Sequence, residues 1–198
     1  MALSSLLLLG TAVTACSPQV MCSTDEPVNM PLFQPGHLTP RDSESTLEIG
    51  DIAPNFSLPA ISGESVELYD LLKDHVVVLT FVPAAFTPVC SKQWPGYNLA
   101  ESYFEEANAV LLGITTDNLP TLYAWVEQMG GLWFPVLSDF YPHGKAASQY
   151  GILRSNGISE RALFVIDQSR VIRYIDVHDI NARPPLEDLV QAIQKVSP

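Results

Sequence analysis

Residues 76–90 read VVVLTFVPAAFTPVC, a run that begins as an apolar strand and ends at a single thiol. An apolar run without polar alternation is typical of a strand that is covered on both faces. Pro83 should end this strand, because proline has no N–H group for a sheet ladder. Thr87 suits the N-cap of a helix, and Pro88 suits the first helical position. The stretch therefore predicts a buried strand, a short turn and a helix with Cys90 at its third position.

The predicted place of Cys90 suggests chemistry for its thiol. A cysteine acts as a nucleophile only as the thiolate, and the free N–H groups and dipole at the start of a helix favour negative charge. However, a lone cysteine after an apolar strand is more often a small buried hydrophobic residue. A cap at Thr87 is compatible with both interpretations, so the rest of the chain must separate them.

Strands and helices alternate along the rest of the chain. The apolar run at 109–114 predicts a second buried strand, and residues 118–129 predict a helix with one apolar face. Residues 161–175 read as an antiparallel hairpin that turns at 167–170. Shorter strands are expected at 53–58, 65–68 and 134–137, and helices near 145–150 and from 185 onward. A helix is also expected after Pro88, with Leu99, Tyr103 and Phe104 on its apolar stripe.

This order of elements predicts an α/β fold with a mixed central sheet and helices on both faces. Parallel strands at the centre and an antiparallel edge would give a thioredoxin-like fold, although the pattern alone leaves other α/β folds open.

Composition excludes several classes of function. The 198 residues are 47% hydrophobic and 16% charged, which predicts one globular domain. The net charge of −12 argues against nucleic acid and anionic lipid surfaces as partners. Three cysteines without a C-x-x-C pair, and four histidines without ligand spacing, predict neither a disulfide scaffold nor a metal site. No cofactor is expected.

The N-terminal residues predict export. Residues 6–15 form an apolar run that is too short to span a bilayer and ends in small residues, as an export signal does. The sequence VTAC at 13–16 resembles the bacterial lipobox, in which the cysteine is lipidated. We therefore expect residues 1–16 to be an export signal and the protein to be a bacterial lipoprotein anchored in the membrane through Cys16. An ordinary cleaved signal is one alternative. The other is a leader that does not act as a signal, which would leave the protein cytoplasmic.

Residues 17–46 separate this leader from the predicted domain. The stretch to residue 45 holds five of the sixteen prolines and shows no periodicity, which predicts a flexible, extended tether. The globular domain is expected over residues 47–198, and the protein would contact a membrane only through its lipid anchor.

Pro83, Thr87 and Cys90 form the pattern P-x-x-x-T-x-x-C between a strand and a helix, which resembles the active-site signature of the peroxiredoxins. The resemblance covers residues 47–198 almost throughout, and the wording SDFYPHG at 138–144 is similar to the one-cysteine AhpE-like subgroup. It implies a thioredoxin-like fold and a thiol-dependent peroxidase that reduces hydrogen peroxide, alkyl hydroperoxides or peroxynitrite.

The resemblance also implies roles for individual residues. Cys90 would be the peroxidatic thiolate that becomes sulfenic acid, and Thr87 would hydrogen-bond the thiolate and orient the peroxide. Pro83 would shield the sulfur from water, and Arg161 would stabilise the thiolate and the charge on the leaving oxygen. For Gln93, one helical turn after Cys90, we expect a solvated or structural position rather than a part in the reaction.

No cysteine follows Cys90, and position 95 is proline, so the usual resolving positions of the family hold no thiol. The resemblance therefore implies a one-cysteine enzyme that an external thiol reduces: a thioredoxin, a glutaredoxin-like protein or a small thiol. Cys22 on the predicted tether is a candidate resolving thiol, although an incidental thiol is the simpler interpretation. A homodimer is also implied. The alternative function is a membrane-tethered thioredoxin-fold binding module without catalysis.

Overall fold

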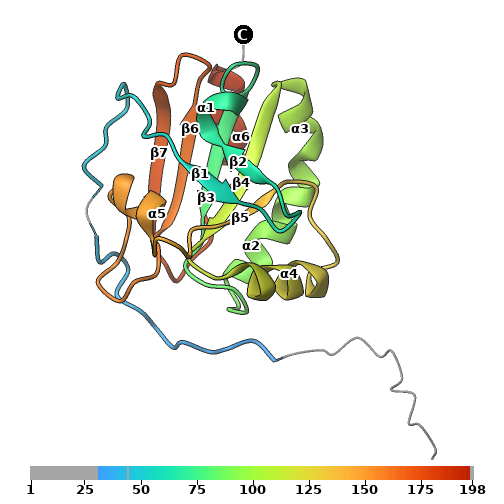
Figure 1. The fold of residues 1–198 in the computed structure, drawn as a ribbon, viewed down its shortest axis with the longest axis vertical. Helices are drawn as coiled ribbons and strands as arrows, with labels where there is room; N and C mark the ends of the chain where they lie inside the picture. Colours follow the sequence, from blue (N-terminus) through green and yellow to red (C-terminus); the bar gives the residue numbers. More distant parts are fainter. Residues whose placement is uncertain (1–30, 44, 197–198) are drawn as a thin grey trace, which may run out of the picture.

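The centre of the computed structural model, which describes residues 31–43 and 45–196, is a five-stranded mixed sheet (Figure 1). Its strand order is β5-β4-β3-β6-β7. The central strand β3 pairs in parallel with β4 and antiparallel with β6, while β5 is parallel to β4 and β7 is antiparallel to β6. The strands are β3 (Val76–Phe81), β4 (Ala109–Thr115), β5 (Val136–Ser138), β6 (Arg161–Ile166) and β7 (Ile172–His178).

Strand β3 is buried along its whole length because the sheet has a hydrophobic core on each face. Alternate side chains of a strand point to opposite faces. Accordingly, Val76 and Val78 belong to one core, whereas Val77 and Leu79 belong to the other. The predicted double cover of this strand is confirmed.

Helices lie on both faces of the sheet. One core contains side chains of α2 (Cys90–Tyr97), α3 (Glu101–Glu106), α4 (Leu119–Gln128) and α6 (Leu186–Val196). The other face is covered by a small antiparallel hairpin of β1 (Ser57–Pro59) and β2 (Ser65–Glu67), and by α1 (Leu68–Leu71) and α5 (Lys145–Gln149), as Figure 1 shows. The predicted arrangement of a mixed sheet between two layers is confirmed.

The helix predicted after Pro88 is divided. A short 3₁₀ turn, η1 (Asn98–Ala100), separates α2 from α3. Because a 3₁₀ turn has three residues rather than 3.6, it changes the direction of the side chains that follow. Phe104 is fully buried, but Leu99 is 82% exposed and Tyr103 is 44% exposed, so the predicted apolar stripe is wrong at Leu99 and Tyr103.

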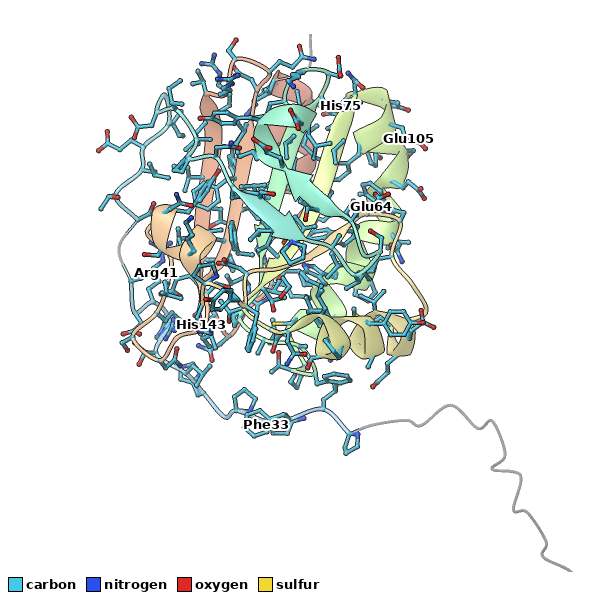
Figure 2. All side chains as sticks on the ribbon, viewed as in Figure 1. Phe33, Arg41, Glu64, His75, Glu105 and His143 are labelled. Atoms are coloured by element: carbon cyan, nitrogen blue, oxygen red, sulfur yellow. The ribbon has the colours of Figure 1, made fainter. Side chains whose placement is uncertain are left out.

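The segment that precedes the domain, residues 31–43, lies along its surface and is called the strap below. Phe33 and Arg41 mark it in Figure 2. Its backbone hydrogen-bonds to the domain at several points, from Phe33 N, which donates to Phe86 O, to Ser43 N, which donates to the Glu160 carboxylate. This part of the predicted tether therefore differs from the expectation of a free chain, because its polar backbone groups find partners on the domain.

Residues 1–30 lie outside the described part of the chain, and with them the predicted export signal, Cys16 and Cys22. Among the described residues, no helix has the length and apolar character needed to cross a membrane.

Candidate active site

The loop after β3 brings the thiol to the start of α2. Cys90 is the first residue of this helix and is 1% exposed, so its side chain is buried beside the helix N-terminus. Thr87 does not cap the helix with its side chain: its hydroxyl instead donates to the carbonyl of Ala84 at 2.9 Å. The prediction of a Thr87 cap with Cys90 at the third position is therefore wrong, although the thiol does lie in the first turn.

The loop between β3 and α2 is fixed by hydrogen bonds and contains one strained residue. Ala85 N donates to the Asp117 carboxylate at 2.8 Å, and Thr115 Oγ1 donates to the same oxygen at 2.6 Å. Phe86 has a φ of 55°, in the left-handed region that is costly for a residue with a Cβ. Such strained backbone persists where the surroundings determine it, and it is common at functional sites.

Arg161 reaches the thiol from the neighbouring strand. It is the first residue of β6, where the antiparallel register pairs Phe81 with Ala162 and so places Arg161 beyond the end of β3. Its Nη2 lies 3.4 Å from Cys90 Sγ, and the side chain is 1% exposed. Residues 71 positions apart in the chain thus meet at the end of the sheet.

The other hydrogen bonds of the Arg161 guanidinium go to neutral groups. Nε and Nη2 donate to the carbonyl of Ile180 at 3.3 and 3.0 Å, and Nη1 donates to Gln93 Oε1. Within the described part of the chain, no carboxylate forms an ion pair with this guanidinium. A buried cation without a counter-charge is costly. The group that lies against it with the chemistry to carry negative charge is the Cys90 thiol.

Gln93 fixes the other side of Arg161. Its side chain is buried, accepts from Arg161, and donates to the hydroxyl of Tyr97 at 2.9 Å. Burial raises the pKa of Tyr97 to about 12, so the phenol stays protonated near neutral pH. Of the two positions expected for Gln93, solvated or structural, the buried side chain fits the structural one. Positions 90, 93 and 97 follow helical i, i+3, i+7 spacing, a signal that places Gln93 and Tyr97 on the face of α2 that carries Cys90.

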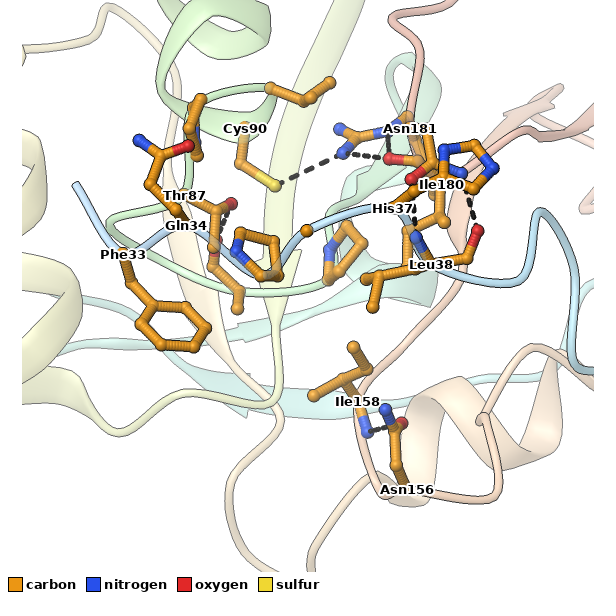
Figure 3. Close-up of a pocket in the computed structure, with 17 residues that line it drawn as sticks. Phe33, Gln34, His37, Leu38, Thr87, Cys90, Asn156, Ile158, Ile180 and Asn181 are labelled. Carbon is orange, nitrogen blue, oxygen red and sulfur yellow. Dashed lines mark hydrogen bonds between the residues drawn. The ribbon is translucent and has the colours of Figure 1, made fainter.

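The predicted site residues Pro83, Thr87, Cys90 and Arg161 line one pocket of about 750 Å³ (Figure 3). The strap supplies part of its wall, including Leu38, which no sequence pattern indicated. In the described ranges, no group of three or more His, Cys, Asp or Glu residues could hold a metal ion. The pocket can therefore bring a small reactant to a buried thiol that a guanidinium contacts.

Comparison with known families identifies the family of the chain. The family model described as the AhpC/TSA family matches residues 49–175. The chain belongs to the AhpC/TSA family.

Related proteins agree with this assignment. The chain is 34% identical to the alkyl hydroperoxide reductase E of Mycobacterium tuberculosis over 132 residues, which cover 66% of this chain and 86% of that protein. It is 30% identical to the putative peroxiredoxin ycf42 of Porphyra purpurea over 158 residues, which cover 76% of this chain and 78% of that protein. The crystal structure of the peroxidoxin BcpB from Mycobacterium tuberculosis superposes with a TM-score of 0.67 at 29% identity, covering 76% of this chain and 98% of that one.

The family membership confirms the predicted peroxiredoxin resemblance and the thioredoxin-like fold, and it makes the protein a thiol-dependent peroxidase. A binding module without catalysis finds no support, because the chain is similar in sequence to proteins named as a reductase and a peroxiredoxin. Its Cys90 thiol and Arg161 guanidinium also line the same pocket. The strap precedes the matched residues and so lies outside the family model.

Proposed function

We propose that Cys90 is the peroxidatic thiol and that it reduces hydrogen peroxide, alkyl hydroperoxides or peroxynitrite. The observation that carries this proposal is the Arg161 guanidinium, which is buried 3.4 Å from Sγ and has no carboxylate partner in the described part of the chain. A cation in this position stabilises the negative charge that develops on the departing oxygen.

The reaction balances as a two-electron transfer from sulfur to peroxide. The Cys90 thiolate attacks one oxygen of the hydroperoxide, an S–O bond forms, and the O–O bond breaks. The sulfur is oxidised to sulfenic acid. The departing oxygen leaves as an alkoxide or hydroxide, which takes a proton to give an alcohol or water, and peroxynitrite releases nitrite instead. Arg161 donates hydrogen bonds toward the developing negative charge.

Three further residues prepare the site for this step. The Thr87 hydroxyl can rotate from the Ala84 carbonyl to hydrogen-bond the bound peroxide, and Pro83 covers the sulfur at the wall of the pocket. Gln93 acts as a positioning residue, since it accepts from Arg161 and keeps the guanidinium directed at the sulfur. Held donors need little reorganisation when charge develops, which lowers the barrier.

An external thiol completes the cycle. It attacks the Cys90 sulfenic acid to give a mixed disulfide and water, and a second thiol then releases the reduced enzyme and a disulfide. Cys90 is the one cysteine among the described residues, so a thioredoxin, a glutaredoxin-like protein or a small thiol is the proposed donor, with a homodimer as the assembly. Cys22 lies outside the described residues. It would be supported as a resolving thiol by a Cys22–Cys90 peptide in non-reducing mass spectrometry after peroxide treatment, and dropped without one.

The lipobox-like sequence at 13–16 supports a further proposal, that the protein is exported and anchored through a lipidated Cys16. Expression of the full chain in a bacterium with labelled palmitate tests this. Label should enter the unaltered protein and be absent from Cys16→Ser, whereas equal labelling of the two would contradict the anchor.

Stopped-flow measurement of Cys90 oxidation by hydrogen peroxide tests the proposed reaction. We expect a fast phase in the unaltered protein and none in Cys90→Ser. A rate constant no greater than that of free cysteine at the same pH would contradict the proposed role of Cys90.

A further inference from the structure

The strap runs across the mouth of the active-site pocket. Figure 3 shows the strap passing from Gln34 to Leu38, with the side chain of Cys90 above it in the view. Residues 33–38 all line the pocket. One wall of the site is therefore built by a segment that the family model does not include.

Polar contacts hold the strap at its centre. The side chain of Asn181 accepts from Leu38 N at 2.9 Å and donates to Leu38 O at 2.8 Å, so both backbone groups of this residue are satisfied. Pro40 O accepts from Ile180 N at 3.1 Å, next to the carbonyl that holds Arg161. The wall is thus connected to the residues that position the guanidinium.

A buried ion pair holds the end of the strap that leads to the domain. Glu160 is fully buried and pairs with Arg154 at 2.6 Å. The same carboxylate accepts the N–H groups of Asp42 and Ser43 at 2.7 and 2.8 Å, and Arg154 also donates to Thr39 O at 2.9 Å. We call Glu160, Arg154 and Asn181 the latch. Charged groups that take backbone partners in this way specify one position of the strap.

The pocket under the strap is larger and more apolar than a hydrogen peroxide molecule requires. Its volume of about 750 Å³ lies in the range of sites for organic ligands, whereas one water molecule occupies only about 30 Å³ of the liquid. The side chains of Phe33, Leu38, Val89, Ile158 and Ile180 line it. Phe33 is 68% exposed, so a bound ligand could cover much of this large apolar ring at the mouth of the pocket.

From these observations we propose that the strap forms a binding site for the hydrocarbon part of an organic hydroperoxide, and that the protein thereby selects organic hydroperoxides over hydrogen peroxide. The inference rests on the proposed peroxidase reaction of Cys90. The peroxide oxygens would lie at Cys90 and Arg161, and the hydrocarbon would lie against Leu38 and Ile158. Burial of apolar surface at this wall stabilises the complex only for substrates that have a hydrocarbon part.

The test compares cumene hydroperoxide with hydrogen peroxide as oxidants of Cys90 in stopped-flow experiments on the full chain. We expect the unaltered protein to react faster with cumene hydroperoxide. In Leu38→Ser the ratio of the two rate constants should fall about fivefold to tenfold, because the variant loses apolar contact with one substrate and not with the other. The matched control is Leu99→Ser, which changes the same residue type on the exposed surface of η1 and should leave the ratio unaltered.

A second measurement needs no variant. The alcohol formed from cumene hydroperoxide, 2-phenyl-2-propanol, should occupy the same wall and slow the oxidation of Cys90 by hydrogen peroxide at least about twofold when it is above its Kd, and glycerol should not. This measurement decides alone if circular dichroism shows that Leu38→Ser does not fold. An unchanged ratio of rate constants in a folded Leu38→Ser, or no effect of the alcohol, would overturn the proposed strap site. If oxidation by hydrogen peroxide is still fast in that case, the proposed peroxidase reaction of Cys90 remains supported. Slow oxidation by both peroxides would contradict the proposed reaction itself.

Discussion

The two walls of the active-site pocket are held in place by different kinds of interaction. On the domain side, Cys90, Gln93 and Arg161 are almost fully buried. The first turns of α2 place Cys90 and Gln93, and the register of β3 against β6 places Arg161. On the strap side, Phe33 is exposed and donates its N–H to Phe86 O, whereas Leu38 is half-buried and hydrogen-bonds to Asn181 of the latch. A wall set by a core changes only when the fold changes, whereas a wall held by a few polar contacts can vary separately. This difference suggests that chemistry belongs to the first wall and substrate choice to the second.

The largest effect is expected on the domain side, from Arg161→Ala. Loss of the guanidinium removes the charge and the hydrogen-bond donor that stabilise the leaving oxygen, so the rate constant of Cys90 oxidation should fall by about a hundredfold or more for both peroxides. Stopped-flow measurement checks it. Arg183→Ala, which removes an exposed arginine that donates to the Lys92 carbonyl, is the control and should keep the rate. An unchanged rate in Arg161→Ala would remove this residue from the site.

The latch gives the largest expected effect on stability. Glu160→Ala leaves Arg154 buried without its partner, and the free energy of unfolding should fall by about 3–5 kcal/mol in urea titrations. Hydrogen exchange at the amides of Asp42 and Ser43, which lose their acceptor, should also become faster. The control is Asp70→Ala, which breaks an exposed ion pair and should leave the stability nearly unchanged. Slow exchange in Glu160→Ala would show that the strap is held by other contacts.

A smaller effect separates positioning from substrate choice. Gln93→Leu removes the acceptor that holds Arg161, and we expect a fall of about tenfold in the rate constant. Because the change lies on the domain side, both peroxides should slow equally and their ratio should stay the same, in contrast to Leu38→Ser. Gln191→Leu on the exposed side of α6 is the control. A changed ratio of the rate constants for the two peroxides in Gln93→Leu would contradict the inference that only the strap wall determines substrate choice.

The smallest effect is a pH dependence of the strap. Hydrogen bonds from the Ser155 side chain and backbone lower the pKa of Asp42 from its usual 3.8. A carboxyl group whose pKa is lower in the folded state contributes stability above its unfolded pKa and loses it as the pH falls through the folded value. Limited proteolysis of the strap should therefore become faster below about pH 4. In Asp42→Asn this pH dependence should be weaker, and an identical profile would exclude Asp42 as the titrating group.

The sequence predicted the domain side of the site well. Residues 76–90 combine an apolar run with proline, threonine and cysteine at a spacing that few other sites share, and Arg161 begins a strand in a chain with few basic residues. The details of the helix start were harder to predict. Thr87 is a good N-cap residue by type, but its hydroxyl turns to the Ala84 carbonyl, and the alternatives differ by a single rotation of the side chain.

The strap could not be predicted from its own residues. Prolines without periodicity predict a flexible, extended chain, but the partners that hold residues 38–43 lie more than a hundred positions away at Arg154, Glu160 and Asn181. Nothing in a local pattern relates these residues to the strap. The sequence also left open whether Gln93 is solvated or structural, since its hydrogen bond to Arg161 joins helix α2 to strand β6.

The sequence by itself thus determined where the candidate thiol lies, because the end of a buried strand and the start of a helix form a local arrangement that neighbouring residues specify. The tertiary structure decided what surrounds that thiol. Strand register brings Arg161 to Cys90, and the latch lays the strap over both, since these contacts join distant residues whose mutual distance appears only when the chain has folded.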